Sequence, residues 1–267
     1  MPSSFSDAVI WITGASSGIG EAVAIELARY PSVRLILSAR RSDELRRVAT
    51  QTGLPEANVM VLPMDMSDTD QFSSYVDAVY QRFGRIDYVF QNAGITQRSA
   101  VVDTDFSVYK RLMDINFFGV VALTKAVLPI MLAQGQGHFV VTSSVAGKLG
   151  TKQRSGYCAS KHALHGFFDA LRAETHADGL RVTLVCPGYI RTPISTNAVD
   201  ANGQKHGRMD ENQEKGMSAS EFTKQLLRAV SQQKEEVYIG GKETYGIYLK
   251  RFLPGLLSRI LRNRQGA

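Results

Sequence analysis

Short apolar runs alternate with longer amphipathic segments along most of this 267-residue chain. The runs are rich in β-branched residues and have the length of buried strands, whereas the longer segments have helical spacing. Because the runs are almost continuously apolar, they indicate a parallel sheet that is covered on both faces. We therefore predict an α/β fold, a doubly wound parallel β-sheet of about seven strands with helices on both faces.

The expected elements can be given as residue ranges. The strands are Val9–Thr13, Leu35–Ala39, Val59–Pro63, Tyr88–Gln91, His138–Ser143, Arg181–Cys186 and Glu236–Ile239. The helices are Ile19–Tyr30, Asp43–Thr52, Thr69–Phe83, Phe106–Leu132, Gly156–His176 and Ala219–Gln232. Right-handed crossovers should connect the parallel strands, as in a Rossmann fold, and residues 1–240 are interpreted as a single domain.

Two segments depart from the alternation. Residues 193–217 follow the sixth strand, and the part from Ser195 to Gly216 is polar and rich in Asn, Gln and Lys. Since ligands of such sheets lie beyond the carboxyl ends of the strands, this segment is interpreted as a substrate lid, with an ordinary surface loop as the alternative. Residues 241–267 form a separate basic amphipathic tail.

Composition narrows the class of protein. Hydrophobic residues make up 44% of the chain and charged residues 21%, which is typical of a soluble globular protein. There is no run of 18 apolar residues, so we expect no membrane-spanning segment. The N-terminus lacks signal-peptide features and there are two cysteines, Cys158 and Cys186, so we expect a cytoplasmic protein. Neither the cysteines nor His162 and His165 have metal-ligand spacing, and no metal is expected.

The net charge of +6 is concentrated at the C-terminus. From Lys242 onward there are six basic residues and one acid, Glu243, a net charge of +5, and the nearly neutral remainder argues against nucleic-acid binding. Pro254-Gly255 should divide the tail into two short helices. The tail's apolar stripe is expected to pack on the body or on a partner, with a peripheral membrane contact as the second interpretation. The stripe consists of Leu249, Phe252, Leu253, Leu256, Leu257, Ile260 and Leu261.

A glycine-rich turn, Thr13-Gly14-Ala15-Ser16-Ser17-Gly18-Ile19-Gly20, joins the first strand to the first helix. Gly14 can form a sharp turn, and Gly18 and Gly20 leave room for a pyrophosphate near the backbone. The helix that follows presents free N–H groups to the phosphates. The turn therefore predicts dinucleotide binding, with a simple tight connection as the alternative. The predicted contacts are Gly14, Ser16, Ser17, Gly18, Ile19 and Gly20.

This turn resembles the nucleotide-binding turn of the short-chain dehydrogenases/reductases, and other motifs of that family follow in the same order. They are Asn92-Ala93-Gly94, Asn116, Ser143-Ser144, Tyr157-x-x-x-Lys161 and Pro187-Gly188. The resemblance extends from Ala8 to about Ile239, with Gln91 where the family usually has a second Asn. Residues 154–174 further resemble the standard-length branch near the hydroxysteroid dehydrogenases. The family resemblance implies hydride transfer between a nicotinamide and a carbonyl or secondary alcohol, and a homodimer or homotetramer.

The end of the second strand bears on which nicotinamide binds. Ala39 occupies the place where NAD-binding members of the family have Asp, and Arg40 and Arg41 follow it. A guanidinium suits a 2′-phosphate because it is planar, charged and bidentate, so we predict NADP(H). The alternative is that both arginines are solvated loop residues. The resemblance places Asp65 and Met66 at the adenine, and Asp65 could instead cap a turn.

The resemblance also assigns the remaining cofactor contacts. They are Asn92, Ala93, Gly94, Tyr157, Lys161, Pro187, Gly188, Ile190 and Thr192. Of these, Ile190 and Thr192 match the family's contacts with the nicotinamide carboxamide.

Tyr157 and Lys161 are four residues apart on an expected helix and therefore face the same way. A free phenol has a pKa near 10, and a neighbouring ammonium would favour the phenolate. The resemblance implies that Tyr157 is the acid/base and that Lys161 binds the nicotinamide ribose. It also implies that Ser144 holds the substrate oxygen and that Asn116 fixes a water linking Lys161 to solvent.

Other classes remain open. A catalytically silent NADP-binding sensor or regulatory protein should have lost Ser144, Tyr157 or Lys161, and all three are present. An epimerase or dehydratase usually has a longer C-terminal domain. The sequence does not identify the substrate, although residues 150–155 at the expected pocket edge are polar and basic. We expect a homo-oligomer built on the fourth and fifth helices.

Overall fold

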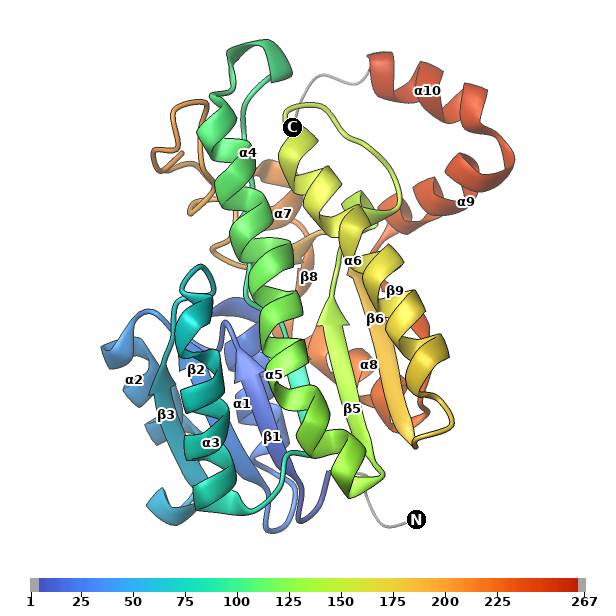
Figure 1. Cartoon of the computed structure of the whole chain (residues 1–267). Helices are drawn as coiled ribbons and strands as arrows, with labels where there is room; N and C mark the ends of the chain where they lie inside the picture. Colours follow the sequence, from blue (N-terminus) through green and yellow to red (C-terminus); the bar gives the residue numbers. More distant parts are fainter. Residues whose placement is uncertain (1–4, 264–267) are drawn as a thin grey trace.

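Seven parallel strands form the central sheet of the computed structural model, which describes residues 5–263 (Figure 1). Their spatial order is β3-β2-β1-β4-β5-β6-β9. The strands are β1 (Val9–Thr13), β2 (Arg34–Ala39), β3 (Val59–Pro63), β4 (Tyr88–Gln91), β5 (Gly137–Thr142), β6 (Leu180–Pro187) and β9 (Glu236–Ile239). The predicted doubly wound sheet is confirmed, and each strand begins and ends within one residue of its expected range.

Helices cover both faces of the sheet. One face carries α1 (Gly18–Leu27), α2 (Ser42–Thr52) and α8 (Ala219–Ser231), and the other carries α3 (Phe72–Phe83), α5 (Gly119–Gln134) and α6 (Ser155–Thr175). The helix α1 ends three residues earlier than expected because Pro31 disfavours helical backbone in the residue before it.

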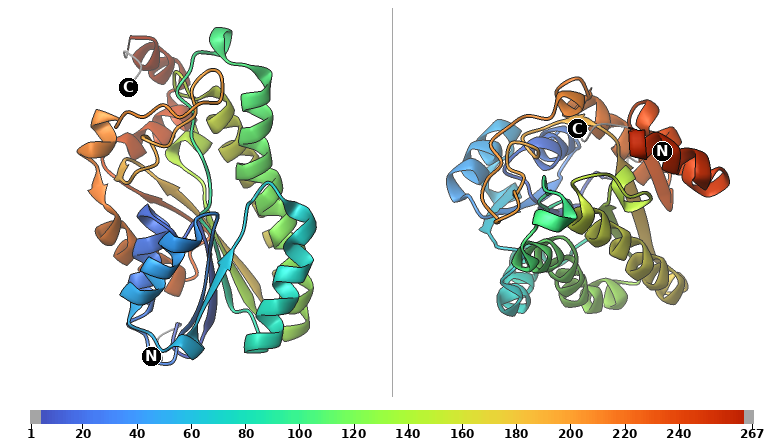
Figure 2. Two further views of the ribbon diagram at one scale, coloured as in Figure 1. Left: turned by 90° about the vertical axis from the view of Figure 1, so that its left-hand side faces the viewer. Right: turned by 90° about the horizontal axis from the view of Figure 1, so that it is seen from above.

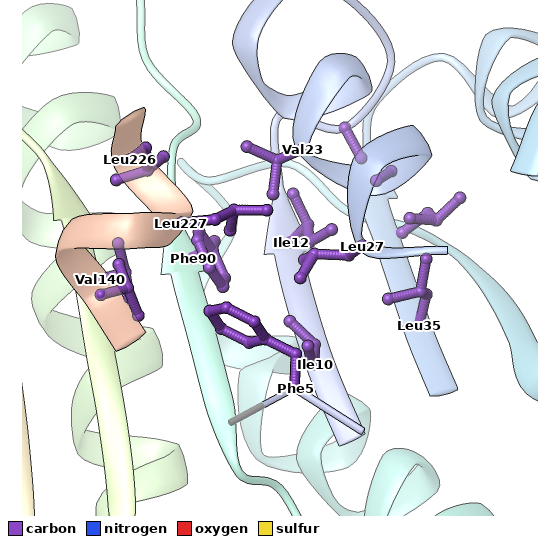
Figure 3. Close-up of a cluster of buried hydrophobic side chains, with 14 of the residues drawn as sticks. Phe5, Ile10, Ile12, Val23, Leu27, Leu35, Phe90, Val140, Leu226 and Leu227 are labelled. Carbon is purple, nitrogen blue, oxygen red and sulfur yellow. The ribbon is translucent and has the colours of Figure 1, made fainter. Parts of the chain in front are cut away.

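The first face has a continuous apolar core. Side chains of β1, β2 and β4 meet side chains of α1 and α8 there, and Figure 3 shows Phe5 packed below them. The members drawn include Ile10, Ile12, Val23, Leu27, Leu35, Phe90, Val140, Leu226 and Leu227. Burial of this apolar area stabilises the fold and fixes where β1 and α1 meet, which is the position of the glycine turn.

The expected helix over residues 106–132 is observed as three consecutive pieces. They are α4 (Phe106–Met113), a π-helical turn (Asp114–Phe118) and α5. The whole segment, Phe106–Gln134, is long and apolar enough to cross a membrane. Its packing accounts for that composition, because Val120, Leu123 and Val127 are fully or almost fully buried against the sheet.

The order of the strands positions the site. From β1 the chain moves outward to β2 and β3, and it then returns to the other side of β1 to form β4, β5, β6 and β9. Ile10 of β1 lies between Leu35 of β2 and Tyr88 of β4 in register. In open parallel sheets, ligands bind beyond the carboxyl ends of the strands where the order reverses. That point lies between β1 and β4.

Two segments from the C-terminal part of the chain lie near the carboxyl ends of the strands (Figure 2). A short pair, β7 (Ile190–Arg191) with β8 (Met217–Ser218), closes the base of the segment interpreted as a lid, which contains α7 (Glu211–Glu214). The tail forms α9 (Tyr245–Phe252) and α10 (Pro254–Asn263), which confirms the predicted break at Pro254. Residues 264–267 of the tail, including Arg264, lie outside the described residues.

Candidate functional site

A cavity of about 540 Å³ lies at the carboxyl edge of the sheet, where the strand order reverses. Its wall runs from the end of β2, across β1 and β4, to β5 and β6. It is lined by every predicted cofactor contact except Gly20, and by Ser144, Tyr157 and Lys161 among the predicted catalytic residues. Residues distributed over 180 positions of the sequence are thus brought to one space.

The glycine turn has the backbone that its sequence predicts. Gly14 and Gly18 have φ angles of 68° and 62°, a left-handed conformation in which a side chain is strained. A Cβ at Gly20 would overlap the carbonyl oxygen of Gly14, and this backbone cannot move aside. Gly20 therefore supports the turn from behind and does not line the cavity.

The turn is tied to β4 by a hydroxyl group. The Thr13 Oγ1 accepts hydrogen bonds from the backbone N–H groups of Asn92 and Ala93, both at 3.0 Å. The ideal Cβ position of Gly14 is 2.9 Å from the Cα of Ala93, so the two loops are in close contact. The cavity floor is therefore rigid, with backbone groups from both loops available to a ligand.

The end of the cavity near β2 is basic. Ala39, Arg40 and Arg41 line it, and Arg41 donates a hydrogen bond to the Ser16 hydroxyl at 3.3 Å. Asp65 also lines this end, although its Oδ1 accepts hydrogen bonds from the Ser67 backbone and hydroxyl, as in a turn-capping residue. Burial opposes the charge of Asp65, but these hydrogen bonds, with smaller contributions from Arg40 and Arg111, hold the pKa of its carboxyl below the usual value.

Two further cations on the cavity wall were not predicted. Arg111 of α4 lines the cavity and donates a hydrogen bond to the Gly203 carbonyl at 3.1 Å, and Lys205 reaches the cavity from the same 193–217 segment. The position of Arg111 on an amphipathic helix gives no sign of this role. Lys205 lies in a segment without periodicity. An anionic ligand in this cavity would therefore meet positive charge from three separate elements.

Tyr157 and Ser144 lie together on the wall, at the beginning of α6 and after β5. Tyr157 is buried, and its phenol and the Ser144 hydroxyl line the same part of the cavity. Lys161 is one turn further along α6, with its Nζ 2.7 Å from the Thr142 carbonyl and 6.0 Å from the centre of the Tyr157 ring. The three predicted side chains therefore occupy one wall, as their spacing indicates.

Burial and nearby charges set the pKa values of this group. Burial raises the pKa of the Tyr157 phenol, and the Ser144 hydroxyl and the charges of Arg154 and Arg98 oppose that rise. Burial also lowers the pKa of Lys161 to about 8. The cations that favour the phenolate in this structure are thus the two arginines. The Lys161 ammonium donates to the Thr142 carbonyl.

Asn116 lies in the π-helical turn and is completely buried. Its Oδ1 accepts a hydrogen bond from the Ile95 backbone, and its Nδ2 donates to the Ile95 carbonyl and the Ser160 hydroxyl. These contacts fix the chain after Gly94 close to Lys161. The structure gives Asn116 a positioning role, while the predicted water contact stays a prediction.

A second cavity of about 260 Å³ adjoins the first and shares Ser144 and Tyr157 with it. It begins at Tyr157 and includes none of the glycine turn that lines the first cavity. Thr151 and Arg154 of the predicted polar edge line it. Apolar side chains of the tail, Leu249, Leu257, Ile260 and Leu261, form its far wall.

The polar wall of this second cavity contains a buried cluster of charges. Asp210, from the 193–217 segment, accepts hydrogen bonds on one carboxylate oxygen from Arg98 and Arg154, both at 2.7 Å. The side chains are 2%, 5% and 15% exposed, respectively. Burial opposes the charge of Asp210, but the two arginines hold the pKa of its carboxyl below the usual value. One acid faces two bases, so the cluster carries a net positive charge beside Tyr157.

A second polar network lies behind the strand end. The Ser143 hydroxyl is 2.9 Å from His165 Nε2, and His165 Nδ1 is 3.6 Å from a Glu236 oxygen that also accepts from Lys148 at 2.8 Å. His165, interpreted from the sequence as packing or surface, thus connects β9 to the turn that carries Ser144. Among residues 5–263, no cluster of His, Cys, Asp and Glu has the geometry to hold a metal.

The family model for short chain dehydrogenases matches residues 8–203 of this chain. Among the similar proteins, dehydrogenase/reductase SDR family member 7B of Bos taurus is 38% identical over 265 residues, which cover 97% of this chain and 81% of that protein. Dehydrogenase/reductase SDR family member 7 of Homo sapiens is 39% identical over 254 residues, covering 93% and 75%.

Solved structures give the same result for the fold. Levodione reductase superposes with a TM-score of 0.79 at 31% identity, covering 90% of this chain and 98% of that one. A short chain dehydrogenase/reductase from Burkholderia phymatum, in complex with NAD, superposes with a TM-score of 0.82 at 24% identity, covering 98% of both chains. The second likeness concerns the fold alone.

Proposed function

Because this chain belongs to the short-chain dehydrogenase/reductase family and is an NAD(P)-dependent oxidoreductase, we propose that it uses NADP(H) and acts on a carbonyl or secondary alcohol. Tyr157 is the acid/base. The observation that carries this proposal is the shared wall of the two cavities, to which both Tyr157 and Ser144 contribute. A substrate oxygen placed there can contact both groups.

The residues present fit a dinucleotide. The left-handed backbone at Gly14 and Gly18 lets the turn pack closely against Ala93 and Thr192, and the start of α1 offers N–H groups to a pyrophosphate. Arg40 and Arg41 would hold the 2′-phosphate, and Lys161 would hold the nicotinamide ribose. The adenine would lie against Asp65 and Met66, the ring system against Asn92, Ala93, Gly94, Pro187 and Gly188, and the carboxamide against Ile190 and Thr192.

The chemistry divides between the cofactor and the chain. When bound, the nicotinamide supplies or accepts the hydride. Ser144 orients the substrate oxygen, and the Tyr157 phenol gives that oxygen a proton during reduction or takes one during oxidation. Asn116 supports the chain beside Lys161. We propose no metal, and we place residues 193–217 over the substrate as a lid on the 1–240 domain.

The location and partners of the protein belong to the same proposal. Cys158 and Cys186 are both buried and unpaired, which supports a cytoplasmic protein. The second cavity supports a small-molecule substrate, and the nearly neutral charge before the tail argues against a nucleic-acid partner. The silent NADP-binding sensor is separated from the enzyme by a panel of carbonyl compounds with NADPH, read by the loss of nicotinamide absorbance. Binding of NADPH without turnover of any compound would favour the sensor.

The first prediction concerns cofactor selectivity. Arg40→Ala should weaken NADPH binding by about 10- to 100-fold, because charged hydrogen bonds contribute about 1.5–3 kcal/mol, while NADH binding stays nearly unchanged. Titration of both cofactors onto the purified protein measures this. The matched control is Arg46→Ala, since the side chain of Arg46 is 70% exposed on α2 and does not line the cavity. Equal or tighter NADH binding by the unmodified protein would contradict the proposal.

The second prediction concerns the oligomer. Phe118 and Leu132 are 53% and 40% exposed on the outer side of the long helical segment, although both are large and apolar. We propose that this face and the adjoining face of α6 pair with a second copy of the chain. Light scattering should give a dimer or tetramer mass, and Phe118→Glu should reduce that mass to a monomer. A monomer mass over a wide concentration range would exclude the oligomer.

A further inference from the structure

The apolar side chains of the tail helices α9 and α10 divide into a buried set and an exposed set. The inner face packs on the body, where Ile247 and Leu257 are buried against Val145 and Leu149. Leu249 and Leu261 are partly buried beside them. The expected packing on the body therefore accounts for these four apolar side chains, and six larger or more exposed ones remain.

The exposed surface of the tail combines large apolar side chains with cations that form no ion pair in the described part of the chain. Its apolar members are 43–73% exposed: Tyr245, Tyr248, Phe252, Leu253, Leu256 and Ile260. The cations Lys242, Lys250, Arg251, Arg259 and Arg262 are all exposed, and none of them forms an ion pair within residues 5–263. We call these eleven residues the tail face.

The shape of the tail face suits insertion into a lipid surface better than binding to a protein partner. Figure 1 shows α9 and α10 meeting in a corner that projects from the body, and the view from above in Figure 2 shows the same projection. Phe252 and Leu253 lie at that corner, with exposed fractions of 73% and 54%. A convex apolar tip beside cations suits a boundary between acyl chains and anionic headgroups.

The charge of the tail face favours an anionic membrane over a second copy of the chain as its partner. Two tail faces packed symmetrically would bring ten uncompensated cations together, because every residue of such an interface meets its own equivalent patch. An anionic bilayer instead attracts each cation and strengthens partitioning about fivefold per residue near the surface.

We propose that the tail face docks this protein on an anionic lipid surface. Phe252, Leu253 and Leu256 enter the boundary of the acyl region, and Arg251 and Arg259 contact the headgroups. The tail is held in place for this role by Glu243, which accepts hydrogen bonds from the backbone N–H groups of Tyr189 and Gly241.

Docking would also set the route to the substrate cavity, a step that rests on the proposed function. Ile260 belongs to the tail face and lines the second cavity, so the docked surface borders the mouth of that cavity. A carbonyl compound dissolved in the bilayer would reach Tyr157 past Leu257 and Leu261 without crossing water. The substrate class favoured by this arrangement is an apolar ketone or aldehyde, or the matching alcohol.

Co-sedimentation of the full-length protein with vesicles tests the docking without cofactor or substrate. The protein should sediment with equimolar phosphatidylcholine and phosphatidylserine, stay in the supernatant with phosphatidylcholine alone, and be released at about 1 M salt, where charges are screened beyond about 3 Å. Failure to sediment with the anionic vesicles at low salt would overturn the proposal, whatever the enzyme activity.

Variants identify the surface that binds. Phe252→Ser with Leu253→Ser should lower partitioning at least about tenfold through lost apolar burial, and Arg251→Glu with Arg259→Glu by at least about 25-fold. The matched control is Val102→Ser with Phe106→Ser, because these side chains are 90% and 72% exposed at another place in the fold. An equal loss in the control would overturn the assignment to the tail face, and so would a vesicle-independent dimer that the tail variants dissolve.

The proposed passage of substrate from the bilayer to the second cavity is tested separately, by the turnover of two ketones. Anionic vesicles should raise the turnover of a long-chain ketone relative to that of a water-soluble ketone, and Phe252→Ser with Leu253→Ser should remove only the vesicle-dependent part. No turnover of either ketone would count against the proposed function and leave the docking intact. Turnover that vesicles leave unchanged would overturn the route.

Discussion

Replacing Tyr157 with phenylalanine is expected to lower kcat/KM by about 100- to 10,000-fold, the range that a positioned proton transfer contributes. The phenylalanine ring still fills the buried position of Tyr157 and still packs beside Lys161, whose Nζ bonds to the Thr142 carbonyl and not to the phenol. The affinity for NADPH should therefore change little. Steady-state kinetics and a cofactor titration on the same protein measure both quantities.

The control for this variant is Tyr80→Phe, since Tyr80 is 47% exposed on α3 and does not line either cavity at the site. It should leave the kinetics and the cofactor affinity at their original values. Activity of the Tyr157 variant within about tenfold of the original protein would mean that another group moves the proton.

The pH dependence of the two reaction directions gives a second readout. Because burial raises the pKa of Tyr157, the phenol carries its proton at neutral pH and can act as an acid. Reduction should therefore be favoured near neutral pH, and oxidation, which needs the phenolate, should accelerate as pH rises. Burial lowers the pKa of Lys161 to about 8, so its charge is lost at a lower pH than the phenol proton, and the positive charge proposed to hold the nicotinamide ribose is lost there. The Tyr157→Phe variant should lose the pH dependence of both reduction and oxidation.

The strands and the glycine turn could be predicted because their signals are local. Residues 9–13 are apolar almost without interruption, and the glycines that follow have the left-handed backbone that other residues avoid. The positions of Arg40 and Arg41 could be predicted in the same way, because the apolar run of β2 shows where that strand ends and the two arginines follow it. A helix boundary was missed where a turn intervened, as at residues 69–71, which form a 3-10 turn before α3.

The charged wall of the second cavity could not be predicted, because the residues that form it are far apart in the sequence. Arg98 and Asp210 are 112 residues apart, and no spacing in the sequence pairs a cation after β4 with an acid in a segment that lacks periodicity. The surroundings of Tyr157 were also beyond what the sequence could indicate. Helical spacing correctly placed Lys161 on the same side as the phenol, but it carries no information about the Thr142 carbonyl that holds the ammonium.

Asp210→Asn is the second change with a large expected effect. The asparagine keeps the shape and can still accept from the Asn212 backbone N–H, which Asp210 now caps at 2.9 Å. It removes the carboxylate charge that compensates Arg98 and Arg154, whose side chains are 5% and 15% exposed. Removing one partner of a buried ion pair reduces the free energy of unfolding by about 3–5 kcal/mol.

Thermal unfolding and limited proteolysis measure this loss. The midpoint should fall by about 10 °C, given about 2–4 °C per kcal/mol for a chain of this size, and cleavage should concentrate in residues 193–217. Glu211→Gln, which removes the same charge from an exposed neighbour, should change neither. An Asp210→Asn protein as stable as the Glu211→Gln control would show that the cluster contributes nothing to holding this segment.

A double variant separates repulsion between the arginines from simple loss of structure. Adding Arg154→Met to Asp210→Asn removes the like charge that faces Arg98, so part of the lost stability should return, whereas independent sites would add their losses.

The same pair of variants reports on the protonation of Tyr157. With Asp210 neutral, both arginines favour the phenolate without compensation, and the oxidation profile should move to lower pH. Adding Arg154→Met should move it back, because one of the two cations that favour the phenolate is then gone. A profile that is the same in both variants would show that the arginines hold the segment in place without influencing the proton on Tyr157.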